Sequence, residues 1–325
     1  MWETKTGFLF IFAFVLGSVI VARDVDGQLV ENFYAKSCPN VESIVQKAVY
    51  NKFIQTFATI PGTLRLFQHD CFVDGCDASL MIQSPNEDAE RDHEDNQSIS
   101  GDAFDTILKA KEAVEANCPG VVSCADIMAL AARDIIVLAK GPNFKVELGR
   151  RDGLVSQKSH ADGKLPHPDF KLAELNAMFG SNGLTQTDMI ALSGAHTIGF
   201  SHCKFFANRI HSSRVDPTLD PEYATKLQNV CPANFDPFLV VNMDPVTPRR
   251  FDNSYFKELV KKRGLFTSDS VLFEDERSRD TVVKFAEDGR EFEKVFVAAM
   301  RKLGRVGVKN GSQGEIRRDC RRFNA

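Results

Sequence analysis

Eight cysteines in a chain of 325 residues constrain the fold more than any other feature of this sequence. All of them lie after an apolar run at residues 7–21, which follows Lys5 and has the shape of a secretory signal peptide. An even number of cysteines behind such a segment predicts an oxidising compartment and a framework of disulfides, and the spacing alone leaves their pairing open.

The apolar N-terminal run is too short to cross a bilayer comfortably, which favours a cleaved signal peptide over the alternative of a membrane anchor. Val25 and Gly27 place the cleavage before Gln28, and cleavage after Ala22 is a second option. We therefore expect a signal peptide at residues 1–27 and a single domain over residues 28–325.

The composition is that of a globular protein, with 43% hydrophobic and 26% charged residues. The net charge of −4 argues against electrostatically driven binding to nucleic acid or to an anionic membrane surface. We expect neither among the partners of this chain, and we expect a monomer.

Apolar residues recur mostly at helical spacing, and long alternating patterns typical of strands are absent. The pattern therefore predicts an all-α fold, one domain in which the functional site lies between two helical halves. Ser123 and Thr185 have the features of N-caps, and residues 84–101 are expected to form a polar surface loop. The expected helices are 41–57, one that starts after 61–62, 127–138, 189–198, 251–263 and 292–303.

Arg65 and His69 are four residues apart in one expected helix, so they share a face. An imidazole can move a proton between two atoms of a substrate, and a fixed cation beside it stabilises developing charge and lowers the imidazole pKa. Taken by spacing alone, the pair is more often a surface arginine and a histidine whose hydrogen bonds are satisfied.

The residues around this pair resemble the distal signature of plant secretory (class III) haem peroxidases. That motif reads Arg-Leu-x-Phe-His-Asp-Cys-Phe-Val-x-Gly-Cys-Asp-Ala-Ser, and residues 65–79 match it with one clear departure. The resemblance implies that His69 is the acid/base for peroxide and that Arg65 promotes O–O cleavage. The departure is Gln68, which stands where the family has an aromatic residue over the haem.

The loop after His69 is rich in the hard oxygen ligands that Ca²⁺ prefers. A polar turn would look the same in sequence, but the resemblance assigns a distal calcium site here. Its members are Asp70, Val73, Gly75, Asp77 and Ser79, with Glu90 acting through water. The same resemblance makes Asn96 the amide that orients His69.

The second motif is centred on His196, which follows Ser193, Gly194 and Ala195 near the end of an apolar helix. Such a histidine is by default a packed core residue, but small neighbours would let a flat macrocycle approach it. The segment resembles the proximal signature of the same family, which makes His196 the axial ligand of haem iron. By the same resemblance Asp269, after Gly264-Leu265, accepts a hydrogen bond from the other nitrogen of His196.

Further matches to the family concern a second calcium ion and the electron donor. The proximal calcium site would comprise Thr197, Asp244, Thr247, Arg250 through its carbonyl, and Asp252, although Asp and Thr at these spacings also cap helices. Pro166 matches a proline whose carbonyl contacts reducing substrates, and Phe205 matches an aromatic residue at the channel mouth. The implied disulfides are Cys38–Cys118, Cys71–Cys76, Cys124–Cys320 and Cys203–Cys231.

The resemblance runs from about residue 28 to residue 320 and implies the haem peroxidase fold, with haem b and two Ca²⁺ ions as cofactors. It predicts a secreted enzyme that reduces H₂O₂ and oxidises small phenolic donors in one-electron steps. The chain ends five residues after Cys320 without a hydrophobic extension, which favours the extracellular space or cell wall over the vacuole. The alternative is a non-catalytic secreted haem and calcium scaffold, or a wall-binding protein, and only Gln68 favours it.

Overall fold

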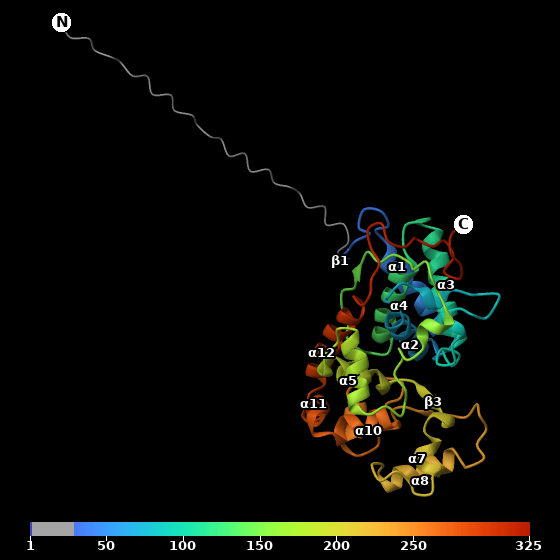
Figure 1. Ribbon diagram of the computed structural model, residues 1–325, viewed down its shortest axis with the longest axis vertical. Coiled ribbons are helices and arrows are strands. Elements are labelled where there is room, and N and C mark those ends of the chain that lie inside the picture. The colour runs from blue at the N-terminus through green and yellow to red at the C-terminus, as the bar shows by residue number, and fades with distance from the viewer. Residues whose placement is uncertain (2–28) are drawn as a thin grey trace.

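The computed structural model describes Met1 and residues 29–325, and within them helices dominate. The expected signal peptide, residues 1–27, falls outside the described residues apart from Met1. Figure 1 shows α1 to α4 gathered in the upper half of the molecule and α7, α8 and α10 in the lower half. The all-α prediction is therefore confirmed.

The helices divide along the chain into two groups. The first group contains α1 Val41–Phe53, α2 Thr59–Phe72, α3 Gly101–Glu115 and α4 Cys124–Leu138. The second contains α5 Leu172–Ser181, α6 Gln186–Ser193, α7 Ala207–His211, α8 Pro221–Val230, α9 Ser254–Val260, α10 Thr267–Glu274, α11 Glu276–Glu287 and α12 Gly289–Leu303.

The strands of the described chain are short and form two antiparallel pairs. In the first pair β1, Val30–Glu31, lies beside β2, Glu147–Leu148. In the second, β3, Phe200–His202, lies beside β4, Val240–Asn242. No helix among the described residues has both the length and the apolar character that a bilayer crossing needs.

The predicted caps hold, but several predicted helix bounds were wrong. Ser123 accepts a hydrogen bond from the amide of Asp126 and caps α4, and Thr185 caps α6 in the same way. α1 stops at Phe53, and α2 begins at Thr59, before Pro61, because proline is tolerated in a first helical turn. α6 ends at Ser193, and the next four residues tighten into a 3₁₀ turn, as helix C-termini often do.

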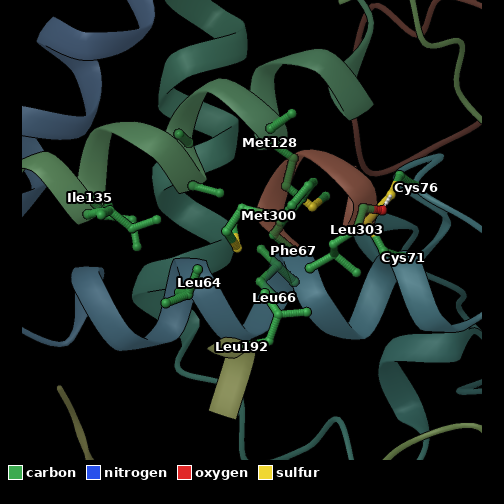
Figure 2. Close-up of a cluster of buried hydrophobic side chains, with 14 of the residues drawn as sticks. Leu64, Leu66, Phe67, Cys71, Cys76, Met128, Ile135, Leu192, Met300 and Leu303 are labelled. Carbon is green, nitrogen blue, oxygen red and sulfur yellow. Dashed lines mark hydrogen bonds between the residues drawn. A yellow bond between two sulfur atoms is a disulfide. The ribbon is translucent and has the colours of Figure 1, made fainter. Parts of the chain in front are cut away.

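The hydrophobic core surrounds α2, the helix that carries the distal motif. Figure 2 shows Leu64 and Phe67 of α2 facing Ile135 and Met128 of α4, with Met300 of α12 beside them. All five side chains belong to one buried cluster. Close packing on this side fixes the opposite face of α2, from which functional side chains project.

Four disulfides join the eight cysteines in the predicted pairs, so that prediction is confirmed. Cys124–Cys320 closes a loop of 196 residues and holds the C-terminal segment against α4. Native disulfides of secreted domains typically contribute about 2–5 kcal/mol, and the contribution grows with the length of the closed loop. This bridge is therefore expected to stabilise the fold more than Cys71–Cys76, which closes five residues.

Candidate active site

A cavity of about 320 Å³ lies between the two helical groups, and the two motifs meet in it. His69 on α2 and His196 in the 3₁₀ turn Gly194–Thr197 both line it. Most of the remaining lining is apolar, including Leu192, Phe179 and Ile198. An apolar cavity with one imidazole from each group suits a flat macrocycle whose iron takes a histidine ligand.

On the distal side, Arg65 and His69 are in direct contact. Nε of Arg65 donates a hydrogen bond to Nε2 of His69 at 3.1 Å. The guanidinium is held in place by Ser98, whose Oγ lies 2.9 Å from Nη1, and by the carbonyl of Asp95, 2.9 Å from Nη2. The cation is thus fixed beside the imidazole, as the spacing of the two residues on one helix predicts.

Asn96 sets the tautomer of His69. Nδ2 of Asn96 donates to the carbonyl of Glu90 at 2.7 Å, which leaves Oδ1 to face the ring. That oxygen lies 2.7 Å from Nδ1 of His69, so Nδ1 carries the proton and Nε2 presents a lone pair. His69 and Asn96 are both buried, so the arrangement is shielded from solvent.

The electrostatics of the distal side favour a neutral histidine beside a charged arginine. Burial, together with the charges of Arg65 and His93, lowers the pKa of His69 to about 3. Burial also lowers the pKa of Arg65 to about 10, so the guanidinium remains charged near neutral pH. A neutral base and a fixed cation are the two parts that proton relay and charge stabilisation require.

On the proximal side, His196 is paired with a buried carboxylate. Nδ1 of His196 lies 2.7 Å from Oδ1 of Asp269, a residue that is 1% exposed. Burial opposes ionisation of Asp269, but the charge and hydrogen bond of His196 bring its pKa below the ordinary value. Because Nδ1 is engaged, Nε2 is the ring nitrogen that remains for a metal.

Gly194 plays a different part from the one its sequence suggests. A Cβ at Gly194 would lie 2.5 Å from the ring of Phe292 and 2.9 Å from that of Phe256. Its small size therefore serves packing of the 3₁₀ turn against α9 and α12. Ser193 and Ala195, in contrast, line the cavity and leave room there, as expected.

The loop after α2 gathers three buried carboxylates. Asp70, Asp77 and Glu90 are each at most 2% exposed, and Oε1 of Glu90 has no hydrogen-bond partner among the described residues. Burial and the charge of Asp77 raise the pKa of Asp70, and burial and the charge of Asp70 raise that of Glu90 to about 9. Oxygen ligands crowded in this way suit Ca²⁺.

Several backbone features shape the same loop. Gly75 has φ of +111°, and a Cβ there would lie 2.3 Å from the carbonyl oxygen of Gly307. Oγ of Ser79 donates to Oε2 of Glu90 at 2.9 Å, while the Lys309 ammonium contacts Asp77. The predicted side-chain ligands therefore lie together, next to the C-terminal segment.

The residues predicted for the proximal calcium site also lie close together. Oγ1 of Thr197 lies 3.5 Å from Oδ2 of Asp244, 3.5 Å from the carbonyl of Arg250 and 3.4 Å from Oδ1 of Asp252. Oγ1 of Thr247 lies 2.9 Å from Oδ2 of Asp244 and 3.1 Å from Oδ1 of Asp252. Hydroxyl, carboxylate and carbonyl oxygens so arranged are a suitable ligand set for a second Ca²⁺.

Three further residues from the sequence prediction line the same cavity: Gln68, Pro166 and Phe205. All three are partly buried, so they stand between the interior and the solvent. Nε2 of Gln68 is buried and has no hydrogen-bond partner among the described residues. The cavity therefore has an amide at the position where the family motif has an aromatic ring.

Sequence reasoning missed the residues that hold the functional side chains from outside the motifs. Ser98 and Asp95 fix Arg65, and no pattern in the sequence marks them. Tyr255 donates a hydrogen bond to Asp269 from α9, a helix whose position relative to α10 is a tertiary property. The amide of Phe266 also donates to Asp269, which the position of this aspartate in the first turn of α10 does indicate.

Comparison with known proteins agrees with this geometry. The model of the peroxidase family matches residues 41–288. Peroxidase 55 of Arabidopsis thaliana is 59% identical over 94% of this chain and 93% of its own length, and Peroxidase 51 of the same plant is 55% identical over 98% of both chains. Peroxidase 16 is 56% identical over 94% of this chain and 96% of its own. The chain therefore belongs to the peroxidase family and is a haem peroxidase of the plant secretory (class III) type.

Proposed function

We propose that this enzyme reduces H₂O₂ with His69 and Arg65 and holds haem through His196, with small phenols as its electron donors. The observation that supports the assignment is that the Arg65–His69 pair and the His196–Asp269 pair line one cavity. Bound haem supplies the iron that exchanges electrons with peroxide and donor.

The protein side of the reaction follows from the hydrogen bonds. Nε2 of His69 takes a proton from one oxygen atom of H₂O₂ and returns it to the other oxygen atom, which leaves as water. The guanidinium of Arg65 stabilises the negative charge that develops as the O–O bond breaks. Asp269 keeps Nδ1 of His196 hydrogen-bonded and so fixes the orientation of the ring.

We also propose that the two clusters of oxygen ligands bind one Ca²⁺ each. The distal site would comprise Asp70, Asp77 and Ser79 with the carbonyls of Val73 and Gly75, and the proximal site the five residues around Asp244. The unpartnered Oε1 of Glu90 and the burial of Asp70, Asp77 and Glu90 support a cation there.

The predicted signal peptide, residues 1–27, and the disulfides support secretion to the extracellular space or cell wall. We propose that the enzyme acts as a monomer.

Phenolic donors are assigned to the part of the cavity beside Pro166 and Phe205. Replacing Phe205 with alanine is expected to raise the KM for a simple phenol roughly 2- to 10-fold, the value of one aromatic contact. Steady-state kinetics at saturating H₂O₂ measures this. Phe238→Ala is the matched control, because Phe238 is 83% exposed and does not line the cavity. An unchanged KM in the Phe205 variant would count against this donor site.

Gln68 is expected to alter the choice of substrate. An amide is less bulky than an aromatic ring, so small molecules reach the distal side of the haem more easily. The parent enzyme should therefore oxygenate a sulfide faster, relative to phenol oxidation, than the Gln68→Phe variant does. Both rates are measured on the same haem-loaded preparations. Equal ratios in the two proteins would refute this role of Gln68.

A further inference from the structure

Tyr255 and His196 share one oxygen of Asp269. The hydroxyl of Tyr255, on α9, donates to Oδ1 at 2.8 Å, and Nδ1 of His196 lies 2.7 Å from that same atom. The two rings meet edge to face, with centroids 5.9 Å apart. Because Tyr255 is 3% exposed, water does not compete freely for this hydrogen bond.

Asp269 accepts few other hydrogen bonds, so the hydrogen bond from Tyr255 is a large share of those it receives. Its other oxygen, Oδ2, accepts a hydrogen bond from the backbone amide of Phe266 at 2.8 Å. Among the described residues, the donors to this carboxylate are therefore one backbone amide, His196 and Tyr255. Of these three donors, the hydroxyl of Tyr255 can be removed by a side-chain substitution that leaves His196 unchanged.

Two donors on one carboxylate oxygen compete for its negative charge. A carboxylate attracts the Nδ1 proton of His196 and makes the opposite nitrogen, Nε2, a stronger electron donor. A second hydrogen bond to that oxygen withdraws part of its negative charge, so the carboxylate attracts the Nδ1 proton of His196 less strongly. Such hydrogen bonds are stronger in a site shielded from water.

We propose that Tyr255 is a positioning residue that limits how strongly His196 donates electrons to the iron, acting through Oδ1 of Asp269. The inference depends on the proposed function, in which His196 binds the haem iron. It predicts that the loss of the Tyr255 hydroxyl strengthens the iron–histidine bond and stabilises ferric over ferrous iron.

Tyr255→Phe in the haem-loaded enzyme tests this directly, because phenylalanine keeps the ring and removes only the hydroxyl. The iron–histidine stretching frequency of the ferrous enzyme, measured by resonance Raman spectroscopy, is expected to rise. The ferric/ferrous reduction potential is expected to fall. Asp269→Asn should shift both quantities in the opposite direction, since it removes the carboxylate charge.

Tyr34→Phe is the matched control for a purely structural effect. Tyr34 is also buried, and its hydroxyl likewise donates to a carboxylate, Oδ2 of Asp126 at 2.7 Å, but it does not line the cavity. Both tyrosine variants are checked for thermal stability and haem content. A shift of the frequency and potential in the Tyr255 variant alone supports the proposal. Unchanged values, an equal shift in the control, or shifts of the opposite sign would overturn it.

Failure of the proposed function is distinguishable from failure of this inference. If the unmodified enzyme shows no iron–histidine band, His196 is not the iron ligand and both proposals fall. If the unmodified enzyme shows the iron–histidine band and Tyr255→Phe does not change its frequency, only the role of Tyr255 is refuted.

Discussion

Leucine in place of His69 is expected to lower the rate constant for reaction with H₂O₂ by about 10²- to 10⁴-fold, the range that general acid–base catalysis contributes. The structure gives the reason. Because Asn96 engages Nδ1, the accepting lone pair of His69 lies on Nε2, where it receives a hydrogen bond from Arg65 that H₂O₂ must replace, and the low pKa keeps Nε2 unprotonated. Arg65 can stabilise charge but cannot accept the peroxide proton.

The measurement is rapid mixing of the haem-loaded variant with H₂O₂, followed in the Soret band. His211→Leu is the matched control, because His211 binds the carbonyl of Cys231 and does not line the cavity. The control should react at the rate of the parent enzyme. A His69→Leu variant that keeps its haem and reacts as fast as the control would show that another group relays the proton.

Removal of calcium is expected to have the second large effect, a loss of about 3–5 kcal/mol in the free energy of unfolding. This is the typical cost when a buried charge loses its partner. Asp70, Asp77 and Glu90 are all buried, and the Lys309 ammonium contacts only Asp77 among them, so without Ca²⁺ the carboxylates repel one another or take up protons. Denaturant unfolding before and after treatment with a chelator gives the difference.

The same treatment should slow the reaction with H₂O₂, because the distal cluster is connected to the catalytic histidine. Asp70 follows His69 on α2, and the carbonyl of Glu90 holds the amide of Asn96. Re-addition of Ca²⁺ should restore both stability and rate, whereas Mg²⁺ should not, because its smaller, stricter octahedron fits such a site poorly. A chelated enzyme with unchanged stability would contradict the assignment of the two clusters to calcium.

Sequence reasoning succeeded where the chemistry lies in contiguous residues. Arg65 and His69 share one helix, so their contact follows from helical geometry once α2 is predicted. The disulfides were predicted by resemblance, since eight cysteines can be paired in many ways. The pairing His196–Asp269 spans 73 residues and was likewise available only from the family motif.

Other features depend on tertiary packing and could not be read from local patterns. Gly194 precedes the proposed ligand like a residue that makes room for haem, yet the rings of Phe256 and Phe292 are what require it. Ser98 reaches Arg65 because a loop folds back over α2, and Tyr255 reaches Asp269 because α9 packs beside α10. Neither contact leaves a periodic or compositional trace in the chain.

The most direct test of the central claim is the reaction of the haem-loaded enzyme with H₂O₂ in the presence and absence of a phenol. If Arg65 and His69 face the iron held by His196, H₂O₂ alone changes the Soret band rapidly, and the phenol restores the original spectrum as it is oxidised. A protein that binds haem but shows no spectral change and no phenol turnover would contradict the account and favour a non-catalytic scaffold.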